Sequence, residues 1–129
     1  MMEPMTAHLR LLQVAQRVGD LDRATAFYRD VLGLAFLGRF DPPGLVFLQL
    51  GDVRLLLDAA APSALLYLEV DDITAEHDHL VAAGVSFGQA PHLVHRHDGT
   101  FAPAGLEEWM AFFHDSEGNL LAIVERRQT

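Results

Sequence analysis

Histidines are the residues of this chain whose spacing first suggests chemistry. The chain holds seven of them, and three fall close together at His92, His95 and His97. If this segment is a strand, alternation places His95 and His97 on one face and His92 on the other. Two imidazoles on one face, with Asp98, Glu107 or Glu108 nearby, could bind zinc or iron. Solvent-exposed histidines on a late strand are the simpler interpretation, and the spacing leaves both open.

Catalysis without a metal needs a side chain that can take up a proton near neutral pH. His95 and His114 are the candidates, and Glu69 is the third, because a carboxyl group enclosed by apolar side chains can serve as a base. No serine stands in a G-x-S-x-G turn, and no glycine-rich phosphate loop is present. An enzymatic site would therefore depend on histidine or on a carboxylate.

Composition excludes several kinds of chemistry. The 129 residues include no cysteine and no lysine, which removes thiolate metal sites, disulfides and lysine Schiff bases. The formal net charge is −9, and the largest basic cluster is Arg126–Arg127, so we expect no nucleic-acid partner. No apolar run is long enough to span a membrane, and Met1–His8 does not resemble a signal peptide. We expect a cytoplasmic protein.

A strand followed by a helix organises the first half of the chain. Residues 9–18 are apolar enough for a strand, and 21–32 carry apolar residues at helical spacing. Asp20 is a suitable helix cap, and Gly33 suits the residue after a helix end. About half a chain length later the pattern recurs as a strand over 65–70, a cap at Asp72, a helix over 73–83 and Gly84. This recurrence predicts two copies of one module.

Several short strands follow each helix. In the first half they are expected at 35–39, 45–50 and 53–57, and in the second at 85–89, 107–114 and 119–125, with 91–97 left open as a further strand and a frayed tail from Arg126. Each copy is therefore β-α-β-β-β, and the fold class is α+β. We expect one domain over 1–129, with module one at about 8–58 and module two at about 64–126.

Two segments carry a resemblance to a known family. The run Leu11–Gly33 resembles the first module of the vicinal oxygen chelate superfamily, which includes glyoxalases, extradiol dioxygenases and bleomycin resistance proteins. Phe112–Asn119 resembles the hairpin before that family's last strand. The resemblance implies two modules that form a curved mixed sheet around a pocket. It also implies one divalent metal held by four side chains.

The four metal-ligand positions implied by the resemblance fall on Gln13, Leu56, Leu65 and Ala122. The second position lies within Leu55–Leu57, where every residue is leucine. Three of the four side chains are apolar, and one neutral amide oxygen does not hold a metal. We therefore expect no metal at the family site and no other cofactor.

The same register implies which residues line the pocket. Alternation from the ligand positions adds Arg17 and Tyr67 to those four, and the register that the resemblance implies for 107–114 adds Met110 and Phe112, while Trp109 would face the helices. Met110 and Phe112 would form an adaptable apolar wall. Arg17 stands where glyoxalase-like relatives bind a substrate carboxylate; an ordinary ion pair, for example with Glu69, is the alternative.

These observations favour a small-molecule-binding protein of glyoxalase/bleomycin-resistance type, a homodimer that sequesters its ligand in an apolar pocket without a metal. The alternative is a glyoxalase-like lyase or isomerase, or a dioxygenase, with an atypical histidine-based site. A catalytically inactive accessory domain is the third interpretation.

Overall fold

Each half of the chain folds as a strand, a helix and three further strands, as the internal repeat predicts. The first half contains β1 (Gln13–Arg17), α1 (Leu21–Ala26) with a π-helical continuation (Phe27–Val31), β2 (Ala35–Phe40), β3 (Leu45–Leu50) and β4 (Val53–Asp58). The second contains β5 (Leu66–Glu69), α2 (Ile73–Ala82), β6 (His92–Arg96), β7 (Glu107–His114) and β8 (Leu120–Arg127). The α+β class is confirmed.

This computed structural model describes residues 10–128. The N-terminal segment Met1–His8, the predicted strand start at residue 9 and the predicted module start at residue 8 lie outside the described residues. Within 10–128, neither helix has the length and apolar character that crossing a bilayer requires.

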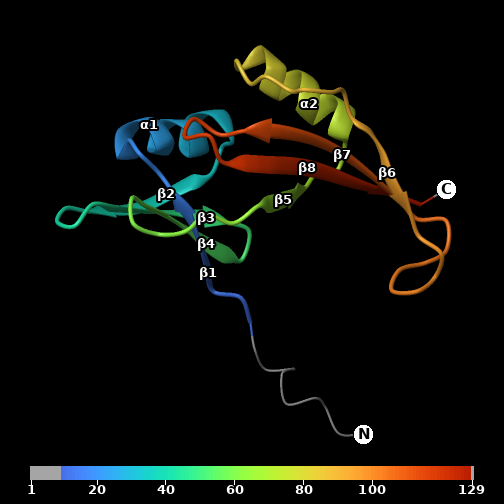
Figure 1. Cartoon of the computed structure of the whole chain (residues 1–129), viewed down its shortest axis with the longest axis horizontal. Coiled ribbons are helices and arrows are strands. Elements are labelled where there is room, and N and C mark those ends of the chain that lie inside the picture. Colours follow the sequence, from blue (N-terminus) through green and yellow to red (C-terminus); the bar gives the residue numbers. More distant parts are fainter. Residues whose placement is uncertain (1–9, 129) are drawn as a thin grey trace, which may run out of the picture.

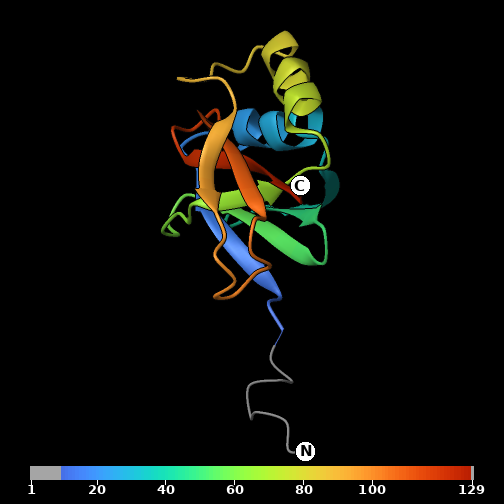
Figure 2. The same cartoon turned by 90° about the vertical axis from the view of Figure 1, so that its right-hand side faces the viewer.

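The strands form two four-stranded mixed sheets, ordered β1-β4-β3-β2 and β5-β8-β7-β6. The first strand of each module pairs in parallel with the last, and the other pairings are antiparallel. Helix α1 contacts β3 and β4, and α2 contacts β7 and β8. Both helices lie on the upper side of the molecule in Figure 1, so each sheet keeps one face without a helix. Figure 2 shows the second sheet in front, with β1 extending below it.

Local sequence signals account for the helix ends. Asp20 Oδ1 accepts a hydrogen bond from the Arg23 amide at 3.0 Å, and Asp72 Oδ1 accepts one from the Ala75 amide at 3.1 Å. These contacts satisfy amides that the first turn of a helix leaves unpaired. Gly33, with a φ of 81°, has the left-handed conformation that glycine adopts without strain after a helix.

The core lies between the helices and the inner faces of the two sheets. Its fully buried members alternate along the strands, as in Leu55 and Leu57 or Ala111 and Phe113. Trp109 is partly buried and packs against this core, which agrees with the prediction that it faces the helices. The Trp109 ring also lies 4.4 Å beneath the Arg127 guanidinium, a cation–π contact.

Two predictions about the second sheet were wrong. Residues 85–89 do not form a strand; Phe87 makes one isolated bridge to Phe113. The chain from Arg126 onward is not frayed, because β8 runs to Arg127 and pairs with the start of β7. The ion pair from Arg126 to Glu69 in β5 and the contact of the Arg127 guanidinium with the Trp109 ring in β7 hold this end on the sheet.

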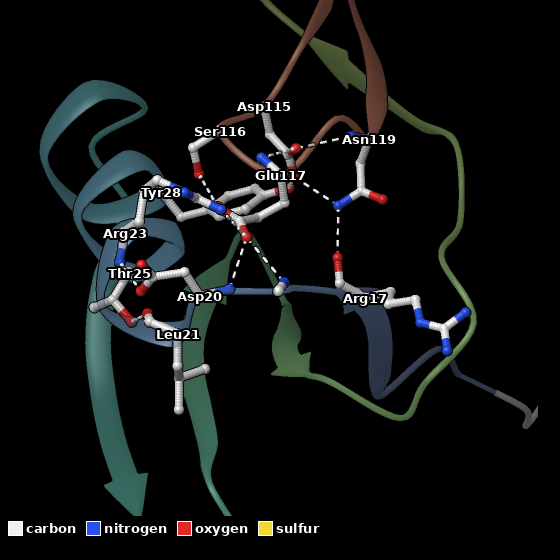
Figure 3. A network of polar contacts seen from close by, with 11 residues as sticks. Arg17, Asp20, Leu21, Arg23, Thr25, Tyr28, Asp115, Ser116, Glu117 and Asn119 are labelled. Atoms are coloured by element: carbon white, nitrogen blue, oxygen red, sulfur yellow. Dashed lines mark hydrogen bonds and ion pairs between the residues drawn. The ribbon is translucent and has the colours of Figure 1, made fainter.

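A cluster of polar contacts joins the two modules (Figure 3). The turn between β7 and β8 carries Glu117. Its carboxylate accepts hydrogen bonds from the amides of Gly19 and Asp20 at 2.8 and 2.9 Å. It also forms an ion pair with Arg23, whose Nε lies 2.7 Å from Oε2. A carboxylate at the first turn of α1 complements the positive end of the helix dipole. We call this set of contacts the clamp.

Asp115 and Asn119 extend the clamp into the interior. Tyr28 donates its hydroxyl to Asp115 Oδ2 at 2.6 Å, and Asn119 Nδ2 donates to the Arg17 carbonyl oxygen at 2.8 Å. Ser63, in the linker between β4 and β5 that joins the two modules, donates to Asn119 Oδ1 at 2.6 Å. The desolvation of Tyr28 and then its hydrogen bond to the buried Asp115 carboxylate raise the pKa of the Tyr28 phenol above its ordinary range. The clamp therefore fixes α1, the linker and the β7–β8 turn together.

Candidate functional site

The faces of the two sheets that carry no helix hold most of the residues predicted to line a pocket. In β7, the core residues Ala111 and Phe113 alternate with Met110 and Phe112, which are only partly buried. In β8, Ala122 and Val124 are buried but lie outside the core cluster. Paired residues share a face, so Phe112 opposite Ala122 and Ala122 opposite Tyr67 place all three side chains on the helix-free face.

A cavity of about 350 Å³ opens on this face of the second sheet. It is lined by Tyr67, Glu69, Glu108, Met110, Val124 and Arg126. The Tyr67 ring lies edge-on to Phe112, with ring centroids 6.2 Å apart, so an aromatic pair borders the apolar part. The floor is therefore apolar and the rim is charged, an arrangement suited to a small organic ligand. We call it the module-two pocket.

Two carboxylates of the module-two pocket have defined partners. Glu69 Oε2 accepts from Arg126 Nε at 2.6 Å, so Glu69 pairs with Arg126 and not with Arg17. Glu108 Oε2 lies 2.6 Å from Nε2 of His97, whose side chain is only 2% exposed. The buried imidazole thus supports a carboxylate that borders the cavity.

The first sheet has a separate cavity of about 320 Å³ on its own helix-free face, lined by Leu37, Gly38, Phe40, Phe47 and Arg54. The Arg54 guanidinium lies 5.6 Å from the Phe47 ring centroid. Arg17, at the end of β1, donates from Nε to the Ala59 carbonyl oxygen at 3.3 Å. Each of these two cavities is lined by residues of one module alone.

The four positions that would hold the family's metal do not form a metal site. Gln13 lies opposite Arg54, and Leu56 lies opposite Ala15, in the first sheet. Leu65 precedes β5, and Ala122 is buried in β8. Three of these four side chains have no donor atom, so the residues present do not fit the metal. Throughout residues 10–128, no three histidine, cysteine, aspartate or glutamate side chains are grouped to bind one.

Gln13 nevertheless shows an unusual feature. Its side-chain oxygen is buried and has no hydrogen-bond partner among the described residues. A buried carbonyl oxygen without a donor costs free energy. The amide group at the first ligand position is therefore not used by the internal packing described for this chain.

The histidine segment differs from its prediction at one position. His92 pairs with Met110 and His95 with Glu108, which places both on the helix-free face. The prediction that His92 lies on the opposite face was wrong, because a bulge between Leu93 and His95 shifts the alternation by one residue. The rings of His95 and His97 meet edge-on, 4.5 Å apart.

The three predicted catalytic residues do not come together. Glu69 lines the module-two pocket, whereas His95 is exposed at the edge strand β6 and His114 is exposed at the far end of β7. His95 pairs with Glu108, and six residues of extended β7, about 20 Å, separate Glu108 from His114. The structure thus provides no shared site for His95 and His114.

Glu108 and Arg126 line the pocket but were missed as ligand-binding residues. Alternation along β7 from Met110 reaches Glu108, and alternation along β8 from Ala122 reaches Arg126. Arg126 was missed because β8 was expected to end before it. The contact between His97, the residue after β6, and Glu108 in β7 depends on the bulge, which has no glycine or proline signal in the sequence.

Solved structures resemble this chain over nearly its full length. A lactoylglutathione lyase from Agrobacterium tumefaciens has 27% sequence identity, with 92% of this chain and 95% of that chain covered and a TM-score of 0.66. The protein SMU.1112c has 25% identity, coverage of 92% and 99%, and a TM-score of 0.70. TnmS3, an antibiotic binding protein from Streptomyces sp. CB03234, has 21% identity, coverage of 94% and 98%, and a TM-score of 0.67, which shows a shared fold.

A search of curated protein sequences finds no significant match. The model of one protein family matches residues 10–123, which include every strand and helix except the end of β8. The match agrees with the resemblance of Leu11–Gly33 and Phe112–Asn119 and with the paired modules of the fold. The chain belongs to the glyoxalase/bleomycin resistance protein/dioxygenase superfamily.

Proposed function

We propose that this protein binds and sequesters a small apolar or aromatic molecule without a metal, and that residues 1–129 act as one glyoxalase-like domain. One observation carries the proposal. Three of the four residues at the family's ligand positions have no donor atom, while the helix-free face of the second sheet keeps an open, mainly apolar pocket bordered by Tyr67 and Met110. TnmS3, an antibiotic binding protein, has the same fold, which supports a binding function.

We also propose that the protein is a homodimer, located in the cytoplasm. Each of the two cavities is open to solvent and lined by one module. Large apolar side chains are exposed beside them, with 54% of Tyr67 and 56% of Phe40 accessible. Exposed apolar surface of this kind is typical of an interface or a ligand site. Sedimentation velocity over a hundredfold range of concentration tests this; a single monomeric species throughout would contradict it.

The binding proposal is tested by thermal stabilisation with a panel of aromatic natural products. A ligand at one hundred times its Kd adds roughly 2.7 kcal/mol to stability, which a melting curve resolves easily. Met110→Trp fills the module-two pocket and should abolish the stabilisation. Leu93→Trp, on the other face of β6, is the matched control and should leave it intact. Stabilisation that survives Met110→Trp would place the ligand elsewhere and contradict the proposal.

A further inference from the structure

The charged rim of the module-two pocket carries more negative than positive charge. Glu69 and Glu108 supply two carboxylates, and Arg126 supplies one guanidinium. Arg126 is already engaged with Glu69 at 2.6 Å. Arg126 lies opposite Glu108 in the β7–β8 pairing, but its ion pair is with Glu69, so Glu108 makes no ion pair with an arginine of the lining. The net charge of −9 on the whole chain adds a field of the same sign.

Glu108 is also held in a fixed position. One of its carboxylate oxygens lies 2.6 Å from Nε2 of His97, and the His97 side chain is 2% exposed while that of Glu108 is 21% exposed. His97 is itself held between the rings of His95 and Phe101, at centroid distances of 4.5 and 4.7 Å. Its backbone amide donates to the Leu106 carbonyl oxygen at 2.8 Å. A buried, packed imidazole thus orients a carboxylate that borders the cavity.

The pocket beside this carboxylate suits the flat body of a ligand. Met110 and Val124 form its apolar floor, and Tyr67 stands at its edge. Aromatic faces attract cations as well as apolar groups, so Tyr67 and Glu108 favour the same kind of ligand. An oriented carboxylate next to an apolar floor recognises an amine attached to an aromatic or other planar body.

We propose that the ligand of the module-two pocket is a planar organic cation, with Glu108 as its ammonium-binding residue and His97 as the residue that positions Glu108. The proposal rests on the proposed binding function and specifies its ligand class. An amine that reaches Glu108 gains a charge-assisted hydrogen bond, which a neutral or anionic analogue of the same shape does not.

Three naphthalene compounds of matched size test the proposal: 1-naphthylmethylamine, 1-naphthylmethanol and 1-naphthoate. Binding to the full chain is measured by NMR titration or calorimetry at pH 7 and low salt. We expect the cation to bind roughly tenfold more tightly than the alcohol, and the anion more weakly than both. Equal affinities for the cation and the alcohol would overturn the inference and leave the proposed binding function standing. Failure of all three to bind would count against the pocket itself, and so against the proposed function.

Single substitutions test which residue causes the preference for the cation. Glu108→Gln keeps a group that can contact His97 and should reduce the cation-to-alcohol ratio to about one while the alcohol still binds. Asp52→Asn, in the β3–β4 turn, removes one negative charge away from the pocket and should leave the ratio unchanged. An unchanged ratio in Glu108→Gln would overturn the assignment of this residue.

Two further variants separate charge and position from folding. Arg126→Gln removes the positive charge of the rim and should raise the affinity for the cation, the opposite direction to Glu108→Gln. His97→Ala should lower the cation-to-alcohol ratio, and His97→Gln, which can still donate to Glu108, should restore part of it. A purely structural role of His97 would weaken the cation and the alcohol equally, and that result would overturn its role as a positioning residue.

Discussion

Replacing Glu117 with glutamine would break the charged centre of the clamp without removing the side chain. The Glu117 side chain is 1% exposed and joins the β7–β8 turn of module two to the first turn of α1 in module one. Glutamine retains one oxygen, which can still accept from the amides of Gly19 and Asp20. Its NH₂ group would face the Arg23 guanidinium, so a donor would meet a donor where the carboxylate had accepted.

The expected loss of stability follows from the pKa of the Glu117 carboxyl group. The Arg23 guanidinium, which donates to Glu117, is the main cause that lowers the pKa of Glu117 from 4.5 to about 2, and the two helix-start amides add to it. At about 1.4 kcal/mol for each tenfold change, that difference is equivalent to about 3 kcal/mol. Arg23 is more than half exposed, so solvent screening weakens the pair. We expect Glu117→Gln to lower the free energy of unfolding by about 2 kcal/mol at pH 7.

Because the pKa of Glu117 is lower in the folded state, its contribution is complete above about pH 4.5 and is lost as the pH falls towards about 2. Urea unfolding of both proteins at pH 7, 5, 4 and 3 measures this. The difference between wild type and Glu117→Gln should stay constant from pH 7 to 5 and shrink steadily below pH 4.5. Circular dichroism and Trp109 fluorescence should report the same transition if the two modules unfold together.

Asp30→Asn is the matched control, because it also removes a carboxylate that pairs with an arginine in the same helical region. The Arg29–Asp30 pair is exposed on both sides and joins neighbouring residues. It should change stability little at any of these pH values. A Glu117→Gln effect as small as that of Asp30→Asn, or one that does not change between pH 7 and 3, would refute the clamp as a stabilising contact.

Three other variants have defined outcomes. Tyr28→Phe removes the 2.6 Å hydrogen bond to the buried Asp115 and should cost about 1–2 kcal/mol in urea unfolding; no change would show that the bond adds nothing. Gln13→Leu replaces the buried oxygen that lacks a partner among the described residues and should stabilise the protein by up to about 1 kcal/mol; destabilisation would show that the amide has a partner. His95→Ala and His114→Ala, made together, should leave the affinity for 1-naphthylmethylamine within twofold, whereas a tenfold loss would show that one of them contacts the ligand.

Local signals in the sequence were sufficient for most of the fold. Asp20 and Asp72 cap the helices as predicted, and β3 and β7 have their predicted bounds, since capping and alternation depend only on neighbouring residues. The predictions failed where the structure of a segment depends on a partner far along the chain. Residues 85–89 have the composition of a strand, yet β6 occupies the place beside β7, and Phe87 keeps a single bridge.

The candidate site shows the same division. The apolar character of Leu56, Leu65 and Ala122 could be predicted, because those positions follow from the resemblance and the residue types alone. The partner of Glu69 could not, since the choice of Arg126 over Arg17 depends on β8 extending past its apolar residues. The contact between Glu108 and His97 depends on the bulge in β6, and that strand contains no glycine or proline that would have indicated a bulge.

The clamp has a consequence for how the chain could be divided. Its contacts join the two modules through side chains and backbone groups, while residues 60–62 of the linker take no part in the contacts described to module two. A break at those residues would produce two fragments, each a strand, a helix and three strands, that keep their mutual contacts. The two halves would then assemble as a split protein, and Glu117 and Asp115 would supply the fit that selects the correct partner. The covalent linker would serve chiefly to keep the two fragments at high local concentration.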